Sequence, residues 1–153
     1  LELRFADEHS DLFDYVVGAY LFREEYQQFN LQSPTTSFAN VRTLSRNGQV
    51  SESIALFGQT DINIRENLAF VLGGRLTRDD KDFELNTTLQ NGTPIRLQSS
   101  ESWDQATWKV GLNYFVRDGM MTYVSVATGY KGGGYNSRAT VAQNIGPYDP
   151  EEV

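Results

Sequence analysis

Apolar and polar residues alternate strictly along part of the C-terminal half of the chain, residues 103–136. Between Thr107 and Val116 every second residue is apolar, and most of the residues between them are polar. Successive side chains of a β-strand point to opposite faces, so this period of two predicts a strand with one apolar face. A second alternating run follows Asp118-Gly119, and Asp-Gly between two such runs is typical of a tight hairpin turn. We therefore expect two long antiparallel strands joined at residues 116–120.

The same alternation recurs in the earlier part of the chain. The clearest case is the run from Leu68 to Thr77, which continues as a polar extension to Leu85, and three further runs cover Leu1–Phe5, Phe13 to about Tyr26, and Glu52–Thr60. Together they predict an all-β fold, an antiparallel meander of about six long strands. A common strand has five or six residues, whereas strands of ten or more have the length that crosses a bilayer at a steep tilt.

The predicted connections alternate between short and long. Short turns are expected at residues 7–11, 61–67 and 116–120, and long polar loops at residues 27–50, 86–101 and 137–153. In a meander, this order places the short turns at one edge of the sheet and the long loops at the other. Outer-membrane barrels have this arrangement.

The alternation also divides the side chains of the strands into two sets. In lipid the apolar set would face the hydrocarbon and the polar set the barrel interior, because a spanning strand survives only in a closed sheet. The lipid-facing candidates are Leu68, Phe70, Leu72, Leu76, Trp108, Val110, Leu112, Tyr114, Val124 and Val126. The lumen-facing candidates are Arg75, Lys109, Asn113, Ser125 and Lys131. Trp108, Tyr114 and Tyr130 lie near strand ends and are candidates for the aromatic girdles at the membrane surfaces.

Composition narrows the class of protein. Only 39% of the 153 residues are hydrophobic and the mean hydropathy is −0.46, which fits a sheet with one wet face better than a soluble domain with a large core. The net charge of −7 argues against nucleic acid as a partner. The chain has no cysteine, and no apolar run reaches the length of a spanning helix. It begins inside an alternating run and ends without a closing element, so we expect a piece of a larger protein.

Candidate chemical sites are weak. His9 is the single histidine, which argues against a histidine metal site or a catalytic triad. The glycines of residues 129–134 lack the Gly-Lys-Ser/Thr order of a phosphate-binding loop. Four acidic residues at 79, 80, 82 and 84 lack the spacing of a calcium loop, and we expect a solvated strand extension there while a loop calcium site stays open. We predict no catalytic residues, no metal site and no cofactor.

One ordered set of motifs resembles a known family. The stretch YVSVATGYKGGGYN at residues 123–136, followed by PYDPE at residues 147–151, resembles the late-barrel segment of TonB-dependent outer-membrane receptors. The stretches 1–4 with 13–22, and 55–59 with 73–77, resemble the paired strands of that family. The resemblance covers nearly the whole chain in the right order.

The resemblance implies a partial receptor barrel over residues 1–153, cut from a cylinder of roughly 22 strands around a plug. The plug and the segment that contacts TonB lie outside this chain. Implied partners are outer-membrane lipid, the TonB complex through the missing plug segment, and a small-molecule or metal-chelate ligand. The implied function is energy-coupled uptake of a scarce nutrient, such as a ferric siderophore, cobalamin or an oligosaccharide, across the bacterial outer membrane.

Two other classes of protein stay open. A soluble all-β carbohydrate-binding or structural module would bury the same apolar faces in a sandwich core. An enzyme on a large β scaffold would need a nucleophile, base or metal cluster, which the sequence does not offer. A second protein layer over the apolar faces would favour the soluble module, and uncovered faces would favour the receptor.

Overall fold

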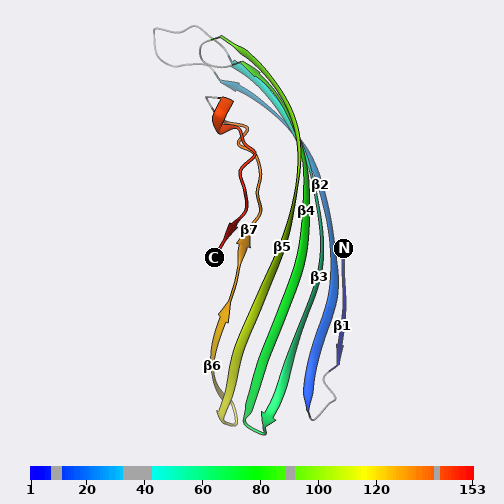
Figure 1. The fold of residues 1–153 in the computed structure, drawn as a ribbon, viewed down its shortest axis with the longest axis vertical. Helices are drawn as coiled ribbons and strands as arrows, with labels where there is room; N and C mark the ends of the chain where they lie inside the picture. The colour runs from blue at the N-terminus through cyan, green and yellow to red at the C-terminus, as the bar shows by residue number, and fades with distance from the viewer. Residues whose placement is uncertain (8–11, 33–42, 89–91, 140–141) are drawn as a thin grey trace.

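A computed structural model describes residues 1–7, 12–32, 43–88, 92–139 and 142–153 of the chain (Figure 1). One antiparallel sheet contains six strands in sequence order, namely β1 (Glu2–Asp7), β2 (Phe13–Gln32), β3 (Thr43–Arg65), β4 (Leu68–Thr88), β5 (Pro94–Arg117) and β6 (Met120–Ala127). A separate two-stranded ribbon pairs β7 (Tyr130–Lys131) with β8 (Glu151–Glu152), and a 3₁₀ turn, η1 (Ala142–Asn144), lies between them. Among the described residues, no helix has the length and apolar content needed to span a membrane.

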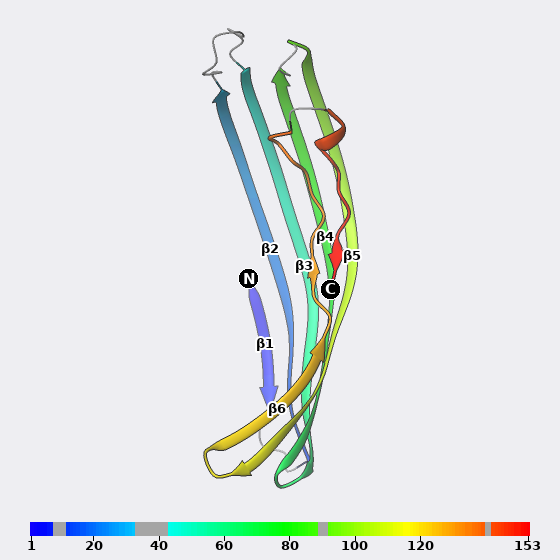
Figure 2. The ribbon, with the colours of Figure 1, turned by 90° about the vertical axis from the view of Figure 1, so that its left-hand side faces the viewer.

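The sheet is bowed, and the C-terminal segment lies in its hollow. Figures 1 and 2 show β7, η1 and β8 on the concave side of the long strands, with no described segment on the convex side. The predicted meander is confirmed, because each strand pairs with its neighbours in sequence and with no others in the sheet.

The four central strands are longer than the sequence predicts. β2, β3, β4 and β5 contain 20, 23, 21 and 24 residues. Crossing a bilayer at a steep tilt takes about 9–11 residues, so each strand has roughly twice that length. The paired register runs without interruption over most of this length, as between Phe13 opposite Ile62 and Gln32 opposite Thr43.

The predicted polar loops were therefore wrong over most of their length. β2 continues to Gln32 and β3 begins at Thr43, so strand replaces most of the loop predicted at residues 27–50. Likewise β4 ends at Thr88 and β5 begins at Pro94, inside the loop predicted at residues 86–101. Beyond the apolar region most side chains of these strands are polar, and the few apolar ones, such as Phe83 and Leu85, are too isolated to give a long period-two signal. Backbone hydrogen bonding to a neighbour needs no apolar face, so the ladder continues regardless.

The turns follow the prediction more closely. Gly119 has a φ of +77°, the left-handed conformation that the Asp-Gly turn between β5 and β6 requires. The turn predicted at residues 61–67 shrinks to Glu66-Asn67, because β3 continues to Arg65. The second strand of the hairpin is shorter than expected, since β6 ends at Ala127 and β7 begins at Tyr130. Most of the turn predicted at residues 7–11 lies outside the described residues.

The described part of the tail predicted as a loop is largely irregular, and it packs on the sheet. Ile145, Phe83 and Leu85 are each at most 3% exposed and form the one cluster of buried apolar side chains identified in the described part of the chain. Tyr135 stacks on Phe83 with ring centroids 4.6 Å apart, and Gly134 exchanges two backbone hydrogen bonds with Tyr148. The core therefore sits on the concave face, between the extended strands and the C-terminal segment.

We expect Ile145→Ala to loosen this segment without affecting the sheet. Truncating a fully buried isoleucine costs about 2–5 kcal/mol, and here the cost falls on the docking of residues 130–150. Hydrogen exchange in the full-length protein should rise in that segment only. Gln143→Ala is the matched control, because Gln143 is exposed two residues away. Unchanged exchange in Ile145→Ala would mean that Ile145 does not hold the segment.

Candidate functional site

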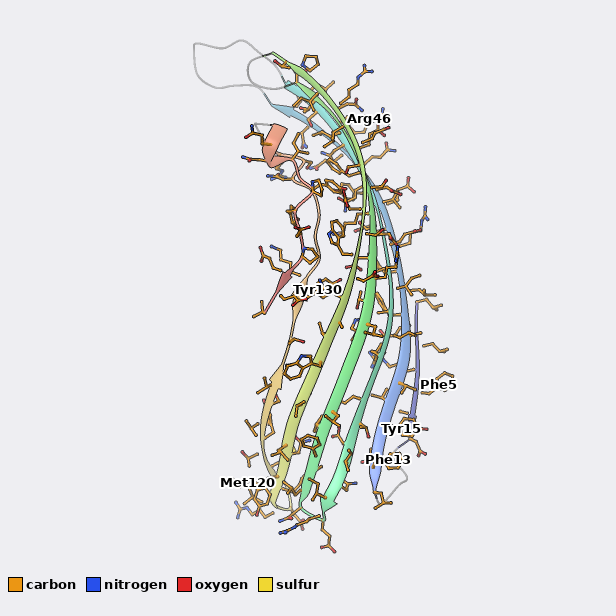
Figure 3. All side chains as sticks on the ribbon, viewed as in Figure 1. Phe5, Phe13, Tyr15, Arg46, Met120 and Tyr130 are labelled. Carbon is orange, nitrogen blue, oxygen red and sulfur yellow. The ribbon has the colours of Figure 1, made fainter. Side chains whose placement is uncertain are left out.

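The convex face of the sheet carries a band of exposed apolar side chains. The interstrand register places all ten residues predicted to face lipid on this face, since Leu68 pairs with Tyr114, Leu72 with Val110, and Val126 with Val110. No described residue covers them, and Leu76, Val124 and Val126 are each more than 60% exposed. Figure 3 shows Phe13 and Tyr15 of β2 on the same side. We refer to this band as the apolar belt.

Charged side chains mark the border of the apolar belt nearer the extended ends of the strands, which is the upper border in Figure 1. On β4, Leu76 is the last apolar residue of the convex face, and Arg78 follows it. Arg78 lies 3.5 Å from Asp80 and 3.6 Å from Asp104. On β2 and β3 the border is an ion pair between Arg23 and Glu52. On β4 the convex face therefore changes from apolar to charged within one step of the alternation.

The height of the apolar belt matches a membrane. On β3 the convex apolar residues run from Ile54 to Ile64, with Gly58 and Thr60 between them, which is about 34 Å along the strand. Tilting such a strand by 35–45° gives a rise of roughly 25 Å, the height of the apolar band of outer-membrane barrels.

The opposite, concave face carries the residues predicted to face the lumen. Arg75 is opposite Thr107, Lys109 opposite Gly73, and Ser125 opposite Gly111, and Asn113 shares their face through its pairing with Ala69. Their orientation toward a lumen stays a prediction. Lys131 lies apart from them in β7, where its side chain is 70% exposed and its Nζ lies 3.9 Å from Glu151, and its orientation toward the lumen likewise stays a prediction.

Arg75 sits among aromatic rings on this face. Its guanidinium carbon lies 5.3 Å from the ring centroid of Tyr20 and 5.8 Å from that of Phe57, and its Nε donates a hydrogen bond to Thr77 Oγ1 at 3.0 Å. Gly18 makes room for Phe57, because a Cβ at Gly18 would lie 2.4 Å from the ring. The rings and Thr77 hold the Arg75 charge in a fixed position on the wall.

Above Arg75, the C-terminal segment is tethered to β4 and β5. The Tyr130 hydroxyl donates a hydrogen bond to Asp79, and Lys81 Nζ donates one to the Gly133 carbonyl. Lys81 Nζ also lies 5.8 Å from the ring centroid of Trp103. Glycine is required at position 133 for the stretch to lie this close to Trp103, because a Cβ there would lie 2.6 Å from the Trp103 ring. Polar contacts and close packing thus fix the glycine-rich stretch against the wall.

Burial raises the pKa of the Tyr130 hydroxyl, and its hydrogen bond to Asp79 raises that pKa further. A raised tyrosine pKa means that the folded state holds the proton more tightly than the unfolded chain. The tether is thus fully present below pH 10, the ordinary tyrosine value, and weakens only as the pH rises through the higher pKa of the folded state. At neutral pH Tyr130 is therefore the donor and Asp79 the acceptor of this hydrogen bond.

Comparison with known proteins identifies the family to which this sheet belongs. A family model described as "TonB dependent receptor-like, beta-barrel" matches residues 2–153. The chain belongs to this family. The family's proteins are located in the bacterial outer membrane.

A solved structure has the same fold. The crystal structure of the ferric yersiniabactin uptake receptor FyuA from Yersinia pestis matches with a TM-score of 0.84 and 23% sequence identity. The match covers 99% of this chain and 23% of that receptor, so the chain spans less than a quarter of the receptor's length. At this identity the likeness concerns the fold alone. No curated protein sequence matches the chain.

Two features of the C-terminal segment differ from what the sequence predicts. Tyr130 was a girdle candidate, but it points to the concave wall, because β7 is separated from β6 and packs over Asp79 (Figure 3). The docking surface for the C-terminal segment was missed. Its signal is present in the alternating apolar pairs Phe83/Leu85 and Ile95/Leu97, which lie inside otherwise polar stretches.

The acidic run of β4 is divided between the two faces of the sheet. Asp79 points to the concave side, whereas Asp80 and Asp82 accept hydrogen bonds from Ser102 and Ser100 on the convex side. Within the described residues, no group of three His, Cys, Asp or Glu side chains could hold a metal ion. His9 lies outside the described residues.

We expect Tyr130→Phe to weaken the docking of residues 130–136 on the sheet. A hydrogen bond to a charged group contributes about 1.5–3 kcal/mol, which corresponds to roughly a tenfold to hundredfold change in local opening. Hydrogen exchange of residues 130–136 in the full-length receptor measures that opening. Tyr148→Phe loses the same hydroxyl in the same segment and serves as the control. Equal exchange in both variants would show that the Asp79 contact contributes nothing.

Proposed function

We propose that residues 1–153 form part of the barrel domain of a TonB-dependent receptor, without its plug, and that the receptor takes up a scarce nutrient across the outer membrane. The cargo would be a ferric siderophore, cobalamin or an oligosaccharide, with energy supplied by the TonB complex through the plug. Transport, and no catalysis, is the proposed activity. The observation that carries the proposal is the division of one sheet into an uncovered apolar belt and a concave face that carries Arg75, Lys109 and Asn113.

The apolar belt supports the membrane part of the proposal. A soluble protein does not leave a continuous apolar surface across four long strands uncovered, because such patches drive association. In lipid the same surface is the favourable one, provided that every backbone group is paired within a closed sheet. The soluble carbohydrate-binding alternative would need a second layer over these residues, and no described residue provides it.

The strands above the belt support the uptake part. They carry the ladder far past the charged border at Arg78, on the side opposite the two-residue turns Glu66-Asn67 and Asp118-Gly119. Outer-membrane barrels have short turns on the periplasmic side and long loops outside. The docked C-terminal segment then narrows the external vestibule that a ligand enters. Arg75, Lys109 and Asn113 line the lumen below it.

The facing of the strands can be tested by placing the same charge on each side. We expect Leu72→Arg to impair barrel insertion more than Asn113→Arg in the full-length receptor. Arginine on the lipid face near the midplane costs roughly 2–4 kcal/mol, whereas arginine in the lumen keeps its water. The measurement is the fraction of heat-modifiable barrel in outer membranes. Equal fractions for the two variants would refute the facing assignment.

Uptake itself can be tested by growth. A strain that lacks the receptor should lose growth on a limiting nutrient of one of the three classes, and the full-length gene should restore it. Restoration should fail when TonB is absent, because the plug cannot be moved without it. Growth that is restored equally without TonB would contradict energy-coupled transport and leave a passive pore.

A further inference from the structure

A trough interrupts the apolar belt on the convex face. Its lower part has a volume of about 370 Å³ and is lined by Tyr15, Val17, Gly58, Thr60, Leu72 and Gly74. Its upper part has a volume of about 450 Å³ and is lined by Ile54, Leu56, Leu76, Arg78, Asp104 and Ala106. The parts adjoin, because Gly74 and Leu76 are successive convex residues of β4, as are Leu56 and Gly58 of β3. We call the whole the glycine trough.

Two glycines facing each other form the floor of the trough. Gly58 pairs with Gly74 in the register, and the neighbours in the same row are Val17 on one side and Trp108 on the other. With strands about 4.8 Å apart, Val17 and Trp108 stand roughly 14 Å apart at their Cα atoms, with no side chain between them. The row therefore has two high walls and a bare floor.

The packing of the protein does not require glycine at either position. A Cβ at Gly74 would meet only the Thr107 carbonyl at 3.9 Å, and one at Gly58 would lie 3.4 Å from Val17 Cγ1. By contrast, Gly18 is needed, since its Cβ would clash with Phe57 at 2.4 Å. Glycine inside a strand weakens it, and without an internal reason it often marks close approach of a ligand. The bare floor thus indicates an occupant from outside the sheet.

The dimensions of the trough match one leaflet of the membrane. From Leu72 to Arg78 it extends about 20 Å along β4. At a tilt of about 45° this is a rise of roughly 14 Å, close to half of the ~30 Å hydrocarbon core. Its upper end lies at the charged border, on the side of the extended strands. An extended hydrocarbon chain running from that border to the bilayer centre has this length and direction.

We propose that the glycine trough holds one acyl chain of a lipid from the external leaflet, lying parallel to the strands. The inference rests on the proposed position of the sheet in the outer membrane. A second receptor copy is the less suitable occupant, because convex walls meet along a line and Val17 and Trp108 keep a partner's backbone off the floor. A flexible chain of methylenes reaches the floor between them.

Packing, and not water exclusion, provides the attraction. Lipid tails are as apolar as the belt, so moving one into the trough gains no hydrophobic transfer energy. The gain is dispersion contact with the floor and both walls, which an empty trough would forfeit. Arg78 is already within 3.6 Å of two carboxylates, so its charge is largely compensated. We therefore assign recognition to the acyl chain of the lipid and not to its head group.

Photo-crosslinking in the purified full-length receptor tests the proposal. Benzoylphenylalanine replaces Leu76 at the trough or Val124 elsewhere on the belt, and both native side chains are 63% exposed. After extensive detergent exchange, the trough position should give a lipid adduct and the Val124 position should not. Gly74→Leu should lower the adduct at position 76 about tenfold, the factor expected for losing on the order of ten carbon–carbon contacts.

The other outcomes overturn the proposal. A receptor–receptor adduct at position 76 would identify the trough as a contact between copies. Three further results would show that the trough holds no bound acyl chain. These are equal lipid adducts at both positions, adducts at neither position, and an adduct that Gly74→Leu does not change. Heat modifiability of the same variants distinguishes a failure of the lipid site from a failure of the proposed function. A barrel that is heat-modifiable without a trough adduct refutes only the lipid site, whereas failure to form a membrane barrel refutes the proposed function.

Discussion

Every long strand of this sheet is held by hydrogen bonds between its backbone N–H and C=O groups and those of its neighbours. In hydrocarbon no water can satisfy these groups, so each strand needs a partner along its whole membrane length. β2 to β5 meet this condition with nearly unbroken antiparallel registers. The same ladder, once established, continues above the apolar belt, where Asp80 faces Ser102 and Glu52. Strand length is therefore set by pairing, while the polarity of the side chains sets only which environment each part occupies.

The register converts a one-dimensional alternation into two surfaces with different roles. Leu72 and Val110 lie side by side on the convex face because they are paired, and Gly73 and Lys109 lie side by side on the concave face for the same reason. A shift of the pairing by one residue would move every side chain of a strand to the other face, so one register determines both the apolar belt and the concave face. The concave wall then provides two levels: the Arg75 cluster among rings, and above it the buried contact of Ile145 with Phe83 and Leu85.

Sequence patterns were sufficient for the sheet and its faces, but not for the segment packed in its hollow. The alternation around Leu72 and Val110 is unambiguous, because an apolar belt in lipid tolerates few polar residues. The extended part of β4 and β5 lacked a long alternation of that kind, since its convex side carries Asp82 and Ser100 and its concave side only short apolar pairs such as Phe83 and Leu85. The docking of residues 130–150 depends on non-local contacts, such as Trp103 against Gly133, that no local period encodes. The glycine-rich stretch carries no apolar period either, and Gly133 permits close packing that the sequence pattern does not reveal.

The convex face of β4 is proposed to lie in lipid up to Leu76 and in water from Arg78 onward. Spin labels placed singly at residues 68–82 of the full-length receptor in lipid vesicles test it most directly. We expect labels at even positions from 68 to 76 to collide with oxygen and to be protected from a water-soluble nickel complex. From position 78 upward the even positions should become accessible to nickel. Nickel access at positions 70 and 72 equal to that at position 80 would contradict it.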